Sequence, residues 1–162
     1  MKCVSDGARG FSLVEISIAL GVAAFCLLAV VGLLQTGLAS ERTTVGKTAA
    51  WGVLSSVSAD LSATAATNTI SAVYGFSFSN SPSPQTIYFT KAGVPTGTLG
   101  NAPTAESYFR ASVGLQNPGA NSAAPTLARL LVSWPAAADP QPESWPTNAS
   151  DSVEVLTALR RN

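Results

Sequence analysis

The sequence places one carboxylate where the burial of a charge would matter. Glu15 is followed by residues 16–34, a stretch of 19 residues with no charged side chain and a single hydroxyl, that of Ser17. A carboxylate at the centre of a lipid bilayer costs about 2.5–3.5 kcal/mol, and less near the bilayer surface. Glu15 therefore lies either at the level of the lipid headgroups or against a cationic partner. The chemistry it offers is charge pairing in an apolar medium.

The other reactive side chains predict neither an enzyme nor a cofactor. The 162-residue chain has no histidine, which removes the commonest general base and the commonest metal ligand. It has no nucleophile-elbow motif and no paired carboxylates. Cys3 lies at the extreme N-terminus and Cys26 in the apolar stretch, so we expect no disulfide that staples the fold. Nine basic and nine acidic residues balance, which argues against a nucleic-acid partner.

Three acidic residues lie in or next to the proline-rich segment 135–150, namely Asp139, Glu143 and Asp151. Carboxylate oxygens are the ligands that calcium prefers. The spacing of these three residues matches no compact calcium-binding loop. We therefore predict no metal site.

The apolar stretch must position Glu15, and it has the length of a membrane-spanning helix. At about 1.5 Å per residue, 19 helical residues extend about 28 Å, close to the ~30 Å hydrocarbon core of a bilayer. All its faces are apolar, whereas a core helix of a globular protein has a polar face. We assign residues 11–39 to this segment, and Lys2 and Arg9 favour a cytoplasmic N-terminus. A secretory signal peptide cut after the stretch, near Ala39, is the competing interpretation.

Residues 40–66 predict an amphipathic continuation of the same helix, since no proline interrupts residues 11–66. Apolar residues recur at spacings of three and four and predict one buried face. That face consists of Trp51, Leu54, Val57 or Ser58, Leu61 and Ala65. The polar side consists of Glu41, Arg42, Lys47 and Asp60.

Residues 67–162 predict a small, mainly antiparallel β-sheet. Five β-prone runs are separated by proline-containing segments, as expected because proline cannot donate to a central ladder. These runs are 70–79, 86–90, 107–115, 127–134 and 152–159. In 107–115, Tyr108, Arg110, Ser112 and Gly114 alternate with apolar or small residues, which predicts one face on a core and one in water. The predicted class is α+β, with a long helix packed on the sheet.

The string Gly10-Phe11-Ser12-Leu13-Val14-Glu15, directly before the apolar stretch, resembles the processing signal of type IV prepilins and of the pseudopilins of type II secretion systems. The family pattern is a short basic leader that ends in glycine, then phenylalanine, an apolar stretch, and a glutamate four residues after the phenylalanine. The apolar helix and an Asp60-Leu61 pair are also similar to the Verru_Chthon cassette pilin-like proteins and to minor pseudopilins. The resemblance implies a pilin-like fold.

The resemblance also implies roles for three residues. A prepilin peptidase would remove the leader 1–10 after Gly10 and methylate the new N-terminus at Phe11. Glu15 would pair with the ammonium of Phe11 on a neighbouring pilin or pseudopilin subunit. The chain would enter the inner membrane once, with its C-terminal region in the periplasm. An assembly platform protein and an ATPase would then move it from membrane lipid into a filament. The length of its loops favours a minor subunit.

A second hypothesis is a membrane-anchored binding module that recognises a secretion substrate or a surface. The segments 91–106 and 135–150 are then the candidate contact surfaces. Loss of binding without loss of filament incorporation, after removal of these loops, would favour this alternative.

Overall fold

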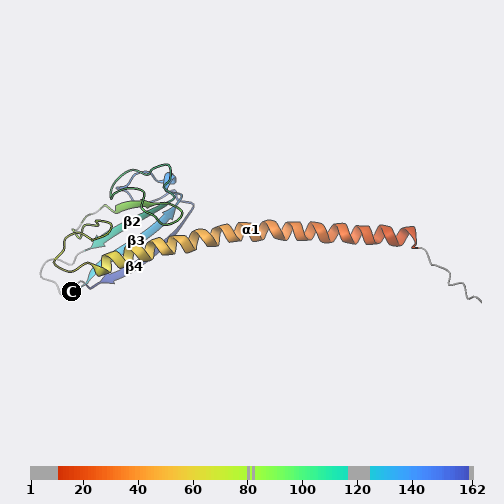
Figure 1. Cartoon of the computed structure of the whole chain (residues 1–162), viewed down its shortest axis with the longest axis horizontal. Coiled ribbons are helices and arrows are strands. Elements are labelled where there is room, and N and C mark those ends of the chain that lie inside the picture. Colours follow the sequence, from red (N-terminus) through yellow and green to blue (C-terminus); the bar gives the residue numbers. More distant parts are fainter. Residues whose placement is uncertain (1–10, 80, 82, 117–124, 161–162) are drawn as a thin grey trace, which may run out of the picture. The chain divides into compact units, whose positions relative to one another are not determined.

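The computed structural model describes residues 11–79, 81, 83–116 and 125–160, with the backbone alone at 36, 38–40, 42 and 43. The predicted leader 1–10, including Gly10, lies outside these residues. The chain divides into two units, Met1–Thr43 and Thr44–Asn162, and each is described by itself. One helix, α1 (Leu13–Ala63), contributes residues to both units (Figure 1).

The described part of the first unit is an exposed apolar helix. Residues Leu13–Gln35 have a mean hydropathy of 2.7, and none of the most hydrophobic window is buried within the protein. The predicted long N-terminal apolar helix is thus confirmed, and it is long and apolar enough to cross a membrane. The crossing itself stays a prediction, as do the boundaries at residues 39 and 66.

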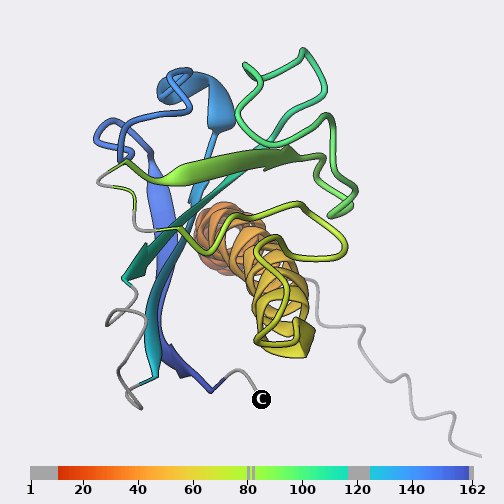
Figure 2. The ribbon, with the colours of Figure 1, turned by 90° about the vertical axis from the view of Figure 1, so that its left-hand side faces the viewer.

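The second unit contains a four-stranded sheet in the order β1-β2-β3-β4, with every neighbouring pair antiparallel (Figure 2). The strands are β1 (Gln85–Phe89), β2 (Phe109–Gln116), β3 (Thr126–Trp134) and β4 (Asp151–Leu159). Four of the five predicted strands are confirmed to within two residues at each end. The α+β class is therefore confirmed, whereas the pilin fold remains a prediction.

The fifth predicted strand, 70–79, is wrong, because this segment folds back on itself. Ser71 N–H donates to the Phe76 carbonyl at 2.9 Å, and Phe78 N–H donates to that of Thr69 at 3.0 Å. The reversal uses a positive φ of 77° at Gly75, a conformation that glycine adopts without steric cost. Phe76 and Phe78 are buried in the core as parts of this turn, and the half-buried Tyr74 packs against the core.

Asp60 holds this turn, which corrects its assignment to the polar side of the helix. Only 6% of Asp60 is exposed. Its Oδ1 accepts the Val73 N–H at 2.9 Å and its Oδ2 accepts the Tyr74 N–H at 3.1 Å. Two backbone donors thus satisfy a buried carboxylate, and they tie the end of α1 to the segment that follows it.

The core lies between one face of α1 and one face of the sheet (Figure 2). The helix contributes Ala50, Val53, Leu54, Val57 and Leu61, all under 5% exposed. The prediction was therefore right for Leu54, Val57 and Leu61. It was wrong for Trp51, which is 48% exposed, and for Ala65, which is exposed. Each residue turns the helix by 100°, so Trp51 lies well round from the buried Ala50.

Candidate functional site

The predicted site residues Phe11 and Glu15 lie at the start of α1. Glu15 is in the first helical turn and is the only charged side chain between residues 11 and 40. Phe11 precedes the helix and is 79% exposed. Gly10, the third predicted site residue, lies outside the described residues. The carboxylate is therefore exposed at one end of a long apolar surface.

Phe11 and Glu15 flank the same shallow groove, of about 510 Å³, on the helix surface. Its lining is completed by Ile16, Ala19, Leu20 and Ala23. Every lining residue except Glu15 is apolar. A second helix packed here would therefore meet one carboxylate in apolar surroundings, where an unpaired charge is costly and an opposite charge is strongly favoured.

The spacing of Ser12 and Glu15 also fits a local role in helix capping, which the sequence interpretation overlooked. Ser12 and Glu15 have the spacing of a capping box, in which the serine and the glutamate bond to each other's backbone N–H groups. The Ser12 carbonyl already accepts the Ile16 N–H at 3.2 Å, so the helix starts next to Ser12. Glutamine serves a capping box as well as glutamate does, but it carries no charge. This difference separates the two roles by experiment.

Apart from Glu15, the polar and small residues of the apolar helix carry no charge. Ser17 Oγ donates to the Leu13 carbonyl at 2.9 Å, so its hydroxyl is satisfied within the helix. Cys26 is an exposed free cysteine. A Cβ added at Gly21 or Gly32 would meet nothing within 4 Å. These features leave room for close approach of another helix without specifying one.

The second unit contains a buried polar cluster centred on Arg110, which the sequence pattern had placed in water. Arg110 is fully buried beneath the segment 135–150. Its Nη1 donates to the Asp139 carbonyl and its Nη2 to that of Gln141, both at 2.8 Å. Nη2 also donates to the Ser144 carbonyl. One arginine thus fixes three points of a loop that crosses the outer face of the sheet, and its burial lowers its pKa.

Asp139 fixes the other end of the same loop. Its carboxylate accepts the backbone N–H of Thr147 at 3.1 Å and that of Asn148 at 3.0 Å. The Asn148 side-chain Nδ2 donates to it at 3.2 Å. Burial by itself raises the pKa of Asp139, but these hydrogen bonds and the charge of Arg110 outweigh burial and lower the pKa below its ordinary value. The loop is therefore held by an ionised carboxylate.

Beside this loop the outer face of the sheet carries a groove of about 590 Å³. Trp145 forms one wall, and the guanidinium of Arg129 lies 4.2 Å from the centre of its ring. Arg129 Nε also pairs with Glu154 Oε1 at 2.6 Å. Leu127 and Leu156, 54% and 75% exposed, complete an apolar surface. The sequence interpretation missed this groove, because it depends on contacts between strands and a distant loop.

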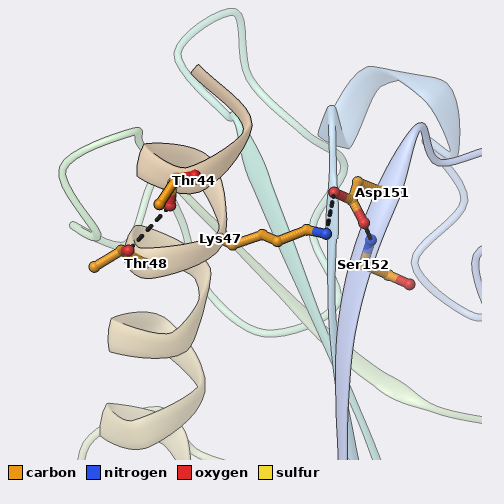
Figure 3. Close-up of polar contacts among 5 residues, drawn as sticks. All are labelled: Thr44, Lys47, Thr48, Asp151 and Ser152. Carbon is orange, nitrogen blue, oxygen red and sulfur yellow. Dashed lines mark hydrogen bonds and ion pairs between the residues drawn. The ribbon is translucent and has the colours of Figure 1, made fainter. Parts of the chain in front are cut away.

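The three acidic residues weighed for calcium have separate surroundings. Asp139 bonds to the loop as described, and Glu143 is exposed. Asp151 pairs with Lys47 Nζ at 3.3 Å and accepts the Ser152 N–H at 2.9 Å (Figure 3). Within the described ranges, no three histidine, cysteine, aspartate or glutamate side chains come together as metal ligands.

Comparison with known proteins adds no relative: no protein-family model, no curated protein and no solved structure matches the chain. The function is therefore inferred from Phe11, Glu15 and the helix that carries them.

Proposed function

We propose that the chain is a subunit of a type IV pilus-like or type II secretion pseudopilus filament. The single observation that carries the proposal is the placement of Glu15. It is the only charge in a long exposed apolar surface, and it follows Phe11 by four residues. In a helix that served only as a membrane anchor, a carboxylate without a cationic partner would cost free energy wherever it entered the bilayer.

The proposed mechanism depends on a new positive charge. Cleavage after Gly10 frees the backbone amine of Phe11, which stays cationic after N-methylation. When the helix leaves lipid and enters a bundle of like helices, Glu15 pairs with this ammonium on a neighbouring subunit. In an apolar bundle, a carboxylate without its partner is strongly disfavoured. The ion pair therefore favours one axial register of neighbouring helices, whose apolar contacts would otherwise be similar in every register.

The proposal includes specific partners and a location. The precursor spans the inner membrane once, with its N-terminus in the cytoplasm and the second unit in the periplasm. A prepilin peptidase processes it, and a platform protein and an ATPase drive its incorporation beside other pilin or pseudopilin subunits. The exposed apolar surface of Leu13–Gln35 supports both states, since it suits lipid as well as a helical bundle.

Cleavage by a prepilin peptidase tests the proposal. The full chain is co-expressed in membranes with an active peptidase or with its inactive active-site variant, and its intact mass is measured. We expect a product that begins at N-methylated Phe11 only with the active enzyme. Gly10→Ala should still be cut, because alanine is nearly as small, whereas Gly10→Glu should stay at full length. A chain that begins at Met1, or near Ser40, in every sample contradicts the proposal.

One observation favours the alternative of a membrane-anchored binding module. The groove beside Trp145 presents exposed leucines on a rigid sheet, a typical setting for a ligand. Trp145→Ala should then abolish binding of a secretion substrate while membrane insertion stays unchanged. The alternative replaces the filament proposal only if the chain also escapes cleavage after Gly10.

A further inference from the structure

The two edges of the sheet differ in how their backbone groups are used. At the β1 edge the chain folds back along the strand. Thr96 N–H donates to the Tyr88 carbonyl and Gly100 N–H to that of Thr86, both at 2.9 Å. The β1 edge is thus covered by its own chain, which is one way in which proteins prevent unwanted strand pairing.

The space between α1 and the β1 side of the sheet is covered as well, by the turn 70–79. The Tyr74 hydroxyl donates to Ser56 Oγ on α1 at 3.2 Å. The Tyr74 ring lies edge-on to Phe89 of β1, with the ring centres 5.5 Å apart. Asp60 holds the same turn through two backbone N–H groups. On this side, therefore, both the sheet edge and the flank of the helix are covered.

The β4 edge has no such cover in the part of the chain that the structure describes. β4 pairs only with β3, over nine consecutive residue pairs without a bulge. The strand contains no proline and no lysine, two residues that commonly prevent pairing at an edge. The backbone donors and acceptors along one side of β4 therefore form a template for another strand.

The flank of α1 on the β4 side carries an exposed aromatic ring. Lys47 Nζ pairs with Asp151 at the start of β4, so Lys47 marks this flank of the helix (Figure 3). Trp51 follows Lys47 by four residues and lies on the same flank, one turn further along. Its side chain is 48% exposed, although the sequence pattern assigned it to the buried face. A strand added beside β4 would cover this ring.

The core-side residues of β4 are incompletely buried. Val153 and Leu159 are under 9% exposed, but Val155 and Thr157 between them are only half-buried. In β1, whose edge is covered, the residues Thr86–Phe89 are all buried. Val155 already packs against the core. One more strand beside β4 would complete the burial of the side chains at 155 and 157.

These features define the chemistry of the occupant. A row of backbone donors and acceptors is satisfied in full by another extended backbone, and alternate side chains then give specificity. The side chains that point to the core side meet Trp51 and Val155, so they must be apolar, since an unpaired charge there is costly. The side chains on the outer face lie beside the exposed Ser152 and Glu154 and can be polar. An extended segment with apolar residues at alternate positions fits.

A second copy of this chain does not fit. α1 and β4 run in the same direction, with Lys47 paired to Asp151 at the start of β4 (Figure 1). Antiparallel pairing of two β4 edges would therefore turn the α1 helices of the two copies in opposite directions, which like-oriented filament subunits cannot adopt. Parallel pairing would turn the outer face of one sheet, with its Arg129–Glu154 ion pair, towards Trp51 of the other.

We propose that the β4 edge and Trp51 form a binding site for an extended segment of a different protein, which adds to the sheet as a fifth strand with its apolar side chains towards Trp51. The added strand runs antiparallel to β4, because every pair in the sheet is antiparallel and such pairs are slightly more stable. Only the exclusion of an antiparallel second copy rests on the proposed function. The site itself uses the second unit alone.

A synthetic peptide tests the site on the full chain in detergent micelles. The probe is acetyl-Lys-Thr-Val-Thr-Val-Thr-Val-Thr-Lys-amide, which has valine on one face and threonine on the other. Amide hydrogen exchange and calorimetric titration measure its binding. We expect saturable binding that slows exchange in β4 and leaves exchange in β1 unchanged.

Two modified peptides test whether the backbone is recognised. One carries N-methyl groups on its three valines, and the other carries them on the two inner threonines. In an extended strand the N–H groups of these two sets point to opposite sides, so only one set faces β4. We expect one modified peptide to lose binding and the other to keep it.

Variants of the chain test the proposed contacts. Trp51→Ala should weaken binding roughly tenfold or more, as is typical of a truncated aromatic anchor. Val45→Ala is the matched control, because Val45 is exposed on the same helix but turned well away from Lys47. Thr157→Lys directs a charge to the core side of the edge and should abolish binding. Ala92→Lys adds the same charge beside the covered β1 edge and should have no effect. Circular dichroism checks that each variant is folded.

Saturable protection of β4, lost with one modified peptide and with Trp51→Ala or Thr157→Lys, supports the proposal. Equal binding of both modified peptides overturns it, because the backbone is then not recognised. Equal weakening by Trp51→Ala and Val45→Ala also overturns it. Two further results contradict it: unprotected β4 at about 1 mM peptide, which detects even weak association, and a dimer of the chain that protects β4 without peptide. Cleavage after Gly10 affects none of these measurements, so failure here is distinct from failure of the filament proposal.

Discussion

The indole ring of Trp145 occupies the space that a side chain at residue 114 would need. A Cβ built on Gly114 would lie 2.8 Å from Cζ2 and 3.2 Å from Cη2 of that ring. The glycine is therefore needed for close approach, and the loop that carries Trp145 rests directly on the β2 backbone. The ring cannot simply rotate away, because Arg129 stacks on it.

Gly114→Ala should displace Trp145 and lower the free energy of unfolding by about 1–3 kcal/mol, the usual cost of overpacking. Urea unfolding of the full chain in detergent measures this change. The double variant Gly114→Ala/Trp145→Ala should recover most of the loss attributed to the clash. If Gly114→Ala costs the same in the presence and absence of the Trp145 ring, the two residues do not conflict and the packing described for them is wrong.

Arg110→Ala should loosen the segment 135–150 and lower the free energy of unfolding by about 3 kcal/mol or more, because it leaves three carbonyls of the loop without their charged donor. Arg129→Ala is the matched control, since Arg129 is exposed, and its ion pair with Glu154 and its contact with the Trp145 ring are each worth about 1 kcal/mol or less. Amide hydrogen exchange locates the effect. Equal destabilisation by both variants would contradict the role assigned to Arg110.

Asp139 should make stability depend on pH in the acid range. Its pKa is lower in the folded chain than in the unfolded chain, so its contribution is complete above the unfolded value, about pH 4. The contribution is lost as the pH falls through the lower, folded value. Asp139→Asn should therefore flatten the acid limb of a plot of unfolding free energy against pH. A limb of unchanged slope in Asp139→Asn would show that other carboxylates cause it.

Glu15 variants should separate helix capping from charge pairing. Both Glu15→Gln and Glu15→Ala should insert into the membrane normally, since both remove a charge from an apolar segment. If the carboxylate pairs with a neighbour's ammonium, both variants should fail to enter filaments. If its role is the capping box, Glu15→Gln should assemble like the natural chain and only Glu15→Ala should be impaired. Counting the chain in purified filaments and in membranes distinguishes these results.

The helix and most of the sheet could be predicted because their signals are local. The uninterrupted apolar run and the alternation in β2 are patterns of neighbouring residues, and each reports the structure of the residues that carry it. The turn at 70–79 has aromatic residues typical of a strand, and only the reversal at Gly75 and the bonds to Asp60 reveal it as a turn. In this segment the local sequence pattern favours a strand, but the tertiary contacts determine a turn.

Among the candidate functional residues, too, some could be predicted from the local sequence and others depend on tertiary contacts. Glu15 stands out because a lone charge in an apolar stretch is visible in the residues themselves. Arg110 looked like a solvated residue of an alternating strand, yet it is buried by a loop about 30 residues further along the chain. Nothing in residues near Arg110 specifies that loop. The groove beside Trp145 escaped prediction for the same reason.

The N-terminus of the assembled chain tests the central claim most directly. Filaments sheared from the native cells are digested, and the N-terminal peptide of this chain is identified by mass spectrometry. The account predicts a peptide that begins at N-methylated Phe11 and retains Glu15, found together with peptides of other pilin-like chains. A chain that is absent from filaments and begins at Met1 in the membrane fraction would contradict it.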